Sequence, residues 1–422
     1  MKRLLLVSYY FPPLAGSGVF RPLRLSKYLP RFGWQVTVLS VSARARVLKD
    51  PSLVAEIPPG CRVLRSTSLE PRTAMIALNK LGLRRLAARI QAFFMVPDDQ
   101  IGWVPLARLR GARLLEREPH DAMVTTAGPY SAHLVGLGLH RKTGIPWVAD
   151  FRDEWTTNPY LRDRYPTSWH CRMNRRQERR VLEQAQRVVC VSRPWLDAIR
   201  ELTPDADEDK FRVLPNGYDA EHFPDRPAPP PDRFRIVYTG MFYGHRSPAF
   251  FLEGVRRALD SGRIPAGDLE ILLVGHTGFA DAASLGGLPP GVVRVMEQRP
   301  YFEALELLQT AALLLLVIPR EGGAGNHTGK LFPYLASGRP ILALAPEPNV
   351  AAELIRESRS GRVVAPDDPA SIASALQELH ASWKRGESLA DQDRELIARH
   401  EASRQARDWA RMLDELIRQP LR

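Results

Sequence analysis

The sequence predicts an α/β protein with two domains, each built around a parallel sheet that helices cover on both faces. Short apolar runs, such as residues 269–275 and 311–318, alternate with helical patterns along the chain. Strands that lack polar alternation are typical of parallel sheets buried on both faces. A proline-rich segment, residues 225–232, separates two halves of this kind and suits neither a helix nor a strand. We therefore expect two Rossmann-like domains joined by this linker.

The apolar runs place the strands in order along each half. The first half has runs at residues 4–8, 35–40, 122–125, 147–150 and 187–192, and the second at residues 235–240, 269–275, 292–295, 311–318, 340–345 and 361–364. Helical patterns cover residues 19–29, 248–259 and 387–417. The expected domains are residues 1–224 and 233–398, followed by a C-terminal helix in residues 399–422. Ligands of such sheets bind at the carboxyl ends of the strands, here facing the cleft between the domains.

Composition and cysteine usage narrow the class of protein. The 422 residues are 44% hydrophobic and 25% charged, which is ordinary for a soluble globular chain. No apolar run approaches the roughly 20 residues that span a bilayer, and the N-terminal run suits a first strand better than a signal peptide. Cys61, Cys171 and Cys190 are scattered and lack metal-ligand spacing, so a cytoplasmic location is expected.

Positive charge is concentrated in the first half. Residues 1–212 contain 35 basic and 20 acidic residues, a net charge of +15, whereas the whole chain has +12. This excess favours an anionic partner such as a phospholipid surface or a lipid-linked phosphate, or it reflects arginines on solvated faces. Residues 74–95 combine apolar helical spacing with basic residues, which suits either a helix on an anionic membrane or one packed on the sheet. No nucleic-acid-binding module is recognised, so nucleic acid is not expected as a partner.

Glycines and basic residues follow three strands of the second half. Residues 321–329 form a glycine-rich loop, and Lys330 stands where the next helix is expected to begin, a combination that suits a diphosphate or an ordinary turn. Gly240 follows the strand at residues 235–240, and Arg246 behind it could act as a forked donor to phosphate. His276 follows the next strand and could contact the base or its phosphates, although a loop histidine is more often structural.

The first half offers two further candidate sites. Gly16 and Gly18 follow the first strand and could admit a phosphate or sugar, or simply make a turn. The third glycine and the acidic residue of a dinucleotide-binding fingerprint are missing, so NAD is not expected. Asp150, Arg152 and Asp153 follow an apolar strand directly. The carboxylates could bind sugar hydroxyls or orient an acceptor, or the three could form a salt-bridge cluster. No metal site is predicted.

The order and spacing of several motifs resemble the GT-B glycosyltransferases of the family-4 type over nearly the whole chain. The motifs are VSYYFPPLAGSGVFRPLRLSKYL, WVADFRDEW, VLPNGYDAEHF, RIVYTGMFYGHRSP and TGKLFPYLASGRPILAL. The resemblance implies two Rossmann-like domains that face each other across a cleft and a C-terminal helix that crosses back to the first domain. It further implies transfer of a sugar from a nucleotide-sugar donor with retention of configuration and no further cofactor.

The same resemblance assigns roles to individual residues. Asp150 falls where many relatives have a histidine near the transferred sugar, and Asp153 follows it closely. The donor phosphates would be approached by glycines of the acceptor-side loop and bound by basic residues and backbone N–H groups. These donor-side residues are Gly16, Gly18, Arg246, Thr328, Gly329 and Lys330.

Three positions depart from the family pattern. Pro333 stands where relatives have the glutamate that binds the donor ribose, Gly325 replaces the partner acid, and Met241 lies near the place of a second basic residue. Glu321 could substitute for the missing acid. The leading hypothesis is a glycosyltransferase that builds an envelope glycan or glycolipid on a glycan or lipid-linked acceptor. The alternatives are a nucleotide-sugar epimerase and a non-catalytic scaffold of a glycan-assembly complex.

Overall fold

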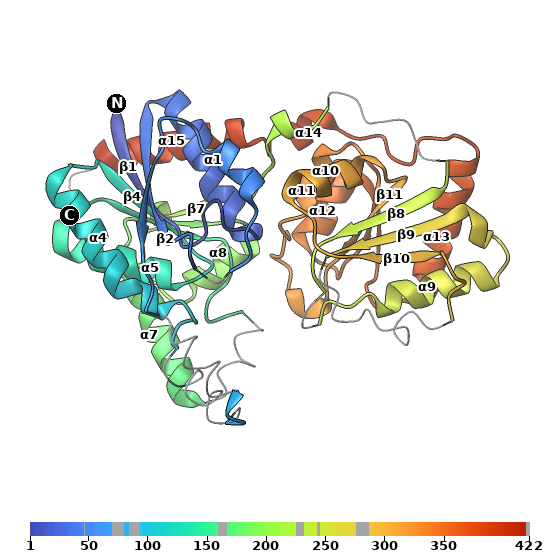
Figure 1. Ribbon diagram of the computed structural model, residues 1–422, viewed down its shortest axis with the longest axis horizontal. Coiled ribbons are helices and arrows are strands. Elements are labelled where there is room, and N and C mark those ends of the chain that lie inside the picture. Colours follow the sequence, from blue (N-terminus) through green and yellow to red (C-terminus); the bar gives the residue numbers. More distant parts are fainter. Residues whose placement is uncertain are drawn as a thin grey trace. The chain divides into compact units, whose positions relative to one another are not determined.

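The computed structural model describes residues 1–45, 47–69, 80–83, 93, 95–158, 167–224, 232–242, 245–275 and 287–418. These form two compact units, one made of residues 1–215 with the segment that begins at Ala402, and one made of residues 216–401 (Figure 1). The predicted linker lies outside the described residues except for Asp232, and so do His276 and most of the segment 74–95. Of the helices described, none is both long and apolar enough to cross a membrane.

The first unit contains a seven-stranded parallel sheet in the order β3-β2-β1-β4-β5-β6-β7. Its strands are β1 (Lys2–Val7), β2 (Trp34–Val41), β3 (Arg62–Ser66), β4 (Ala122–Thr126), β5 (Trp147–Phe151), β6 (Arg187–Cys190) and β7 (Phe211–Val213). Its α-helices are α1 (Phe20–Tyr28), α4 (Val104–Arg117), α5 (Ser131–Thr143), α7 (Ser168–Gln184), α8 (Arg193–Arg200) and α15 (Ala402–Arg418). Short 3₁₀ helices are η1 (Ser17–Val19), η2 (Leu29–Phe32), η3 (Pro51–Glu56), η4 (Ile101–Trp103) and η5 (Glu208–Lys210).

The strand order decides which helices cover each face of this sheet. The chain runs from β1 outward to β3 and then returns to β4 on the other side of β1. Right-handed crossovers therefore place α1 on one face and α4, α5 and α7 on the opposite face. The packing agrees, because α1 contacts α15 whereas α5 contacts α4 and α7.

The last helix completes the core of the first unit. Trp409 and Leu413 of α15 are buried in the same apolar cluster as Leu4 and Leu6 of the central strand. The indole N–H of Trp34 donates to an Asp414 carboxylate oxygen at 2.8 Å, which fixes the helix to the start of β2. The C-terminal helix is therefore part of the first unit's core.

The second unit contains a six-stranded parallel sheet in the order β10-β9-β8-β11-β12-β13. Its strands are β8 (Phe234–Thr239), β9 (Leu269–Val274), β10 (Val293–Met296), β11 (Leu313–Val317), β12 (Ile341–Leu344) and β13 (Gly361–Val364). Its α-helices are α9 (Ala249–Asp260), α10 (Tyr301–Gln309), α11 (Leu331–Ala336), α12 (Val350–Glu357), α13 (Pro369–Lys384) and α14 (Arg394–Ala398), with 3₁₀ helices η6 (Ala220–His222), η7 (Ala266–Asp268) and η8 (Arg320–Gly322).

Strand β11 shows why the apolar runs predicted this sheet. Leu313 and Leu315 pack into the core on one face, whereas Leu314 and Leu316 pack into the core on the other. Successive side chains of a strand point to opposite faces, so a strand covered on both sides must be apolar throughout. The predicted α/β class with two Rossmann-like domains is confirmed.

Candidate active site

The strand orders define one switch point in each sheet. In the first unit the chain reverses direction across the sheet between β1 and β4, and in the second unit between β8 and β11. Loops that leave neighbouring strands in opposite directions open a crevice at their carboxyl ends, where α/β proteins bind ligands. Most of the predicted site residues follow β1, β5, β8 or β11, close to these two points.

In the second unit, Lys330 reaches from the loop after β11 to the end of β8. Its ammonium nitrogen lies 3.9 Å from the ring centroid of Tyr238, a cation–π contact. Gly240 leaves the space that this contact needs, since a Cβ atom there would lie 2.7 Å from the Lys330 Nζ. Gly240 also has a φ of +123°, a conformation that other residues rarely adopt. Glycine is therefore needed at position 240 for two reasons: its positive φ and the space that the Lys330 side chain occupies.

A second glycine keeps the ends of β8 and β9 together. A Cβ atom on Gly275 would lie 2.1 Å from the carbonyl oxygen of Gly240, and its φ is +143°. The backbone N–H of Gly240 donates a hydrogen bond to the carbonyl oxygen of Val274 at 2.7 Å. This close approach holds Gly240 in place beneath Lys330.

Two positive charges meet at this switch point. Desolvation and the charge of Arg246 together hold the pKa of Lys330 well below its usual range. Arg246 is itself buried, with 8% of its surface exposed. An anion placed here would favour the charged form of Lys330 and offset the repulsion between the two cations. The second unit therefore provides a cationic site suited to phosphate.

Asn349 holds the loop between β11 and α11. Its side-chain oxygen accepts hydrogen bonds from the N–H groups of Ala351 and Ala352 at the start of α12, and its amide nitrogen donates to the Gly323 carbonyl at 3.0 Å. The same loop contains Thr328 at a φ of +35°, which is rare for a β-branched residue. Its backbone N–H donates to the Asn326 side chain at 2.9 Å. The loop thus keeps a strained conformation beside Lys330.

Pro333 does not interrupt the helix that follows. It is the third residue of α11, where a backbone N–H would have no partner within the helix. The backbone N–H of Tyr334 donates to the carbonyl oxygen of Lys330, and that of Ser337 donates to the carbonyl oxygen of Pro333. The buried Tyr334 hydroxyl accepts from the backbone N–H of Thr239 at 2.9 Å and so joins α11 to the end of β8.

Glu321 and Gly329 lie at opposite ends of the predicted phosphate loop. Glu321 belongs to η8, is exposed, and lies 3.7 Å from the His245 ring nitrogen. Gly329 is exposed and precedes Lys330 directly. The catalytic role expected for Glu321 remains a prediction.

In the first unit, Asp150 is completely buried in an ion pair that the sequence did not reveal. Arg21 of α1 donates to both of its oxygens, at 2.8 and 2.9 Å, and Thr126 donates at 2.7 Å. Arg21 also donates to the carbonyl oxygens of Leu214 and Pro215, at 2.8 Å each. This geometry favours a structural role for Asp150, which ties β5 to α1 and to the end of the first unit.

Arg152 connects the two loops that flank the switch point of the first unit. Its guanidinium donates to the carbonyl oxygens of Ala127 after β4, at 2.8 Å, and of Gly18 after β1, at 3.0 Å. A Cβ atom on Gly18 would lie 3.0 Å from the Tyr10 ring, whereas one on Gly16 would meet nothing within 4 Å. Gly16 nevertheless requires glycine because its φ is +107°. Arg152 therefore organises the loop that carries both glycines.

Asp153 is the carboxylate that remains accessible at this point. Its side chain is exposed, yet surrounding protein desolvates it enough to raise its pKa, with Arg152 acting in the opposite direction. One carboxylate oxygen lies 3.1 Å from the position that a Cβ atom would take on Gly128. Asp153 is therefore better placed than Asp150 to contact a substrate hydroxyl.

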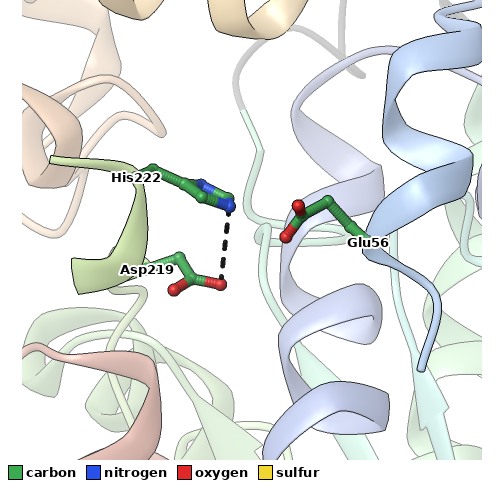
Figure 2. Close-up of side chains that lie close together, drawn as sticks. All are labelled: Glu56, Asp219 and His222. Carbon is green, nitrogen blue, oxygen red and sulfur yellow. Dashed lines mark ion pairs between the residues drawn. The ribbon is translucent and has the colours of Figure 1, made fainter.

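The candidate metal ligands that the structure describes belong to different units. Figure 2 shows the ion pair between Asp219 and His222 of the second unit, whose oxygen and ring nitrogen are 3.8 Å apart. Glu56, drawn with them, belongs to the first unit, where it forms an ion pair with Lys27 at 2.9 Å. In the part of the chain that the structure describes, neither unit by itself assembles three such side chains.

Sequence comparisons identify both halves of the chain. Residues 18–217 match the profile described as "Glycosyl transferase 4-like domain", and residues 233–382 match that described as "Glycosyl transferases group 1". The comparison with curated proteins gives no match.

Solved structures share the fold over almost the whole chain. Sucrose-phosphate synthase from Thermosynechococcus elongatus has a TM-score of 0.66 at 16% identity, with 99% of each chain covered. Alr3699/HepE from Anabaena, solved in complex with UDP and glucose, has a TM-score of 0.63 at 15% identity, covering 98% of this chain and 100% of that one. WaaG, a glycosyltransferase involved in lipopolysaccharide biosynthesis, has a TM-score of 0.59 at 14% identity, with 98% of each chain covered.

Proposed function

Because the chain belongs to the GT-B glycosyltransferases of the family-4 type, we propose that it moves a sugar from a nucleoside-diphosphate donor to a glycan or lipid-linked acceptor. The observation that carries this proposal is Lys330, held against Gly240 and Tyr238 with Arg246 nearby. The HepE complexes with UDP and with UDP-glucose support a nucleotide sugar as donor. The name of WaaG supports an acceptor in envelope glycan synthesis.

The proposed reaction is a retaining transfer that uses no metal ion. Lys330 and Arg246 stabilise the negative charge that develops on the diphosphate as its bond to the sugar breaks. The acceptor hydroxyl attacks the same face of the sugar that the diphosphate leaves, and the departing phosphate takes its proton. Asp153 orients a hydroxyl of the sugar or of the acceptor. Gly16 and Gly18 let the substrate approach the backbone closely.

The structure also bears on the alternative of a non-catalytic scaffold. Pro333 has no side-chain acceptor for a ribose hydroxyl, which is the main support for that alternative. However, Pro333 lies in the first turn of α11, and the helix retains its contact with β8 through Tyr334. Because the helix and its attachment to β8 persist without the usual glutamate, we favour a transferase with a different ribose contact.

We further propose that the protein acts in the cytoplasm. Cys61, Cys171 and Cys190 form no disulfide bond with one another, which suits a reducing compartment.

Donor binding tests the proposal directly. Calorimetry and thermal shift with UDP-, GDP-, ADP- and dTDP-sugars, without added metal, should reveal one donor that binds saturably. The variant Arg246→Ala/Lys330→Ala should lose this binding. Arg356→Ala/Arg362→Ala removes two exposed arginines of the same unit and should bind like the wild type. If the folded wild type binds no donor, the scaffold alternative is preferred.

A further inference from the structure

Helix α7 of the first unit has an inner face that is firmly attached to the fold. Its buried residues are His170, Asn174, Glu178, Val181 and Leu182. Asn174 accepts a hydrogen bond from the Trp155 indole at 2.9 Å, and Glu178 accepts from the backbone N–H of Thr156 at 3.2 Å. Both partners come from the segment just after Asp153. The orientation of α7 is therefore fixed.

The outer face of α7 carries a stripe of arginines. The spacing of its members, i, i+3, i+4, i+7 and i+8, places them on one side of the helix. A rise of 1.5 Å per residue makes the stripe about 12 Å long. Its members, all exposed, are Arg172, Arg175, Arg176, Arg179 and Arg180.

In the part of the chain that the structure describes, a carboxylate pairs with only one member of this stripe. Arg179 pairs with Glu183 at 2.8 Å, whereas the other four arginines form no ion pair with any residue that the structure describes. Many exposed arginines elsewhere in the chain do have carboxylate partners, such as Arg62 with Glu118 and Arg193 with Asp197. Among the described residues, Glu178 also interacts electrostatically with Arg175, but most of the stripe has no compensating charge.

Two exposed aromatic rings lie at the start of the same helix. Phe93 is 52% exposed and Trp169 is 39% exposed, and their rings stack in parallel with centroids 4.9 Å apart. Trp169 is the second residue of α7 and lies about one turn before the arginine stripe. Aromatic side chains next to basic ones are typical of surfaces that lie at the membrane interface.

We propose that the outer face of α7, together with the Phe93–Trp169 stack, docks on an anionic phospholipid surface. The arginines would contact lipid phosphates while the two rings enter the interface between headgroups and acyl chains. A nucleic-acid duplex would meet the charge through its phosphates but would leave the stacked rings in water, and no module that binds single strands is recognised in the sequence, so a lipid surface fits both features. The inference goes beyond the proposed transferase activity and does not depend on it.

Vesicle flotation tests this surface in the full-length protein. Binding to phosphatidylcholine vesicles is compared with binding to phosphatidylcholine mixed with phosphatidylglycerol. The variant Arg172→Glu/Arg176→Glu/Arg180→Glu is compared with Arg407→Glu/Arg411→Glu/Arg418→Glu, which changes the net charge equally on exposed positions of α15. Far-UV circular dichroism and donor binding of each variant show that the fold and the cationic site of the second unit are intact.

We expect the wild type to prefer the anionic vesicles. The α7 variant should lower the partition coefficient at least about a hundredfold, from about fivefold for each arginine near an anionic surface. The α15 variant should lower it much less. Trp169→Ala should weaken binding by a factor that persists at high salt, because the contribution of the ring is not electrostatic.

Three results would overturn the proposal. Equal binding by the two triple variants would show that net charge alone acts. Equal binding of the wild type to neutral and anionic vesicles would exclude lipid phosphates as the ligand. Retention of an oligonucleotide rather than vesicles, lost in the α7 variant, would assign the stripe to nucleic acid.

Discussion

Replacing Gly240 with alanine tests whether this glycine is needed for its backbone conformation or for the position of the Lys330 side chain. The new Cβ atom would lie 2.7 Å from the Lys330 Nζ and 3.1 Å from its Cε. The end of a lysine side chain moves easily, so the protein should fold with the ammonium group displaced. The φ of +123°, which side-chain-bearing residues rarely adopt, adds backbone strain of about 1–3 kcal/mol. We therefore expect a modest loss of stability and a larger loss of function.

The expected loss of donor affinity follows from the contact between the Lys330 ammonium group and the donor phosphate that the displacement would remove. A hydrogen bond to a charged group contributes about 1.5–3 kcal/mol, so donor binding should weaken by about tenfold to a hundredfold. Gly262→Ala is the matched control, since Gly262 also has a positive φ, of +72°, but an added Cβ atom would meet nothing within 4 Å. Calorimetry gives the donor affinity, and thermal unfolding gives the stability. Equal donor affinity in the two variants would refute the assignment of Lys330 to the phosphate site.

Three further predictions follow from the ion pairs, the pKa values and the core. Arg21→Met leaves the buried Asp150 carboxylate without its partner and should lower the free energy of unfolding by about 3–5 kcal/mol, whereas Arg21→Met/Asp150→Leu should recover part of this in chemical denaturation. Because the pKa of Lys330 is lowered, its charge should be lost at a lower pH than that of an exposed lysine, and an anionic donor should raise the pKa again. Donor affinity should therefore fall as the pH rises through the lowered pKa, with proton uptake in calorimetry, and Lys330→Arg should abolish this dependence; an unchanged profile would contradict it. Trp409→Ala should lower the free energy of unfolding of the first unit by about 3–5 kcal/mol, and a change below 1 kcal/mol would mean that α15 adds little to the core.

The sequence predicted every strand of the second sheet, including its edge strands β10 and β13, but it missed both edge strands of the first sheet. Strands such as β11 are apolar throughout because both faces are covered, and this pattern is visible in a short window. β3 (Arg62–Ser66) and β7 (Phe211–Val213) lie at the edges of the sheet, are short or rich in polar residues, and were not predicted. The long helical pattern over residues 387–417 is divided into α14 and α15, and between them the carbonyl oxygen of His400 accepts a hydrogen bond from the backbone N–H of Tyr218.

The candidate site could be located from the sequence, but its internal contacts could not. Glycines and charges at strand ends indicated Gly240 and Lys330, but their direct contact joins positions 90 residues apart. The partner of Asp150 is Arg21, which lies 129 residues earlier on α1. No local pattern shows which arginine of a basic chain will reach a given carboxylate. Asn349 is likewise recognisable only once the loop after β11 is seen to lie against α12.

The position of α15 has a consequence for the order in which the protein can fold during synthesis. β1 leaves the ribosome before the second unit does, yet its residues Leu4 and Leu6 share their apolar cluster with residues of α15, which is made after the second unit. The second unit lies between these two segments in the chain and contains its own sheet and cores. Domains generally fold as units when their residues are available. The second unit can therefore fold first, while nascent chains expose one side of the N-terminal sheet until α15 has been synthesised.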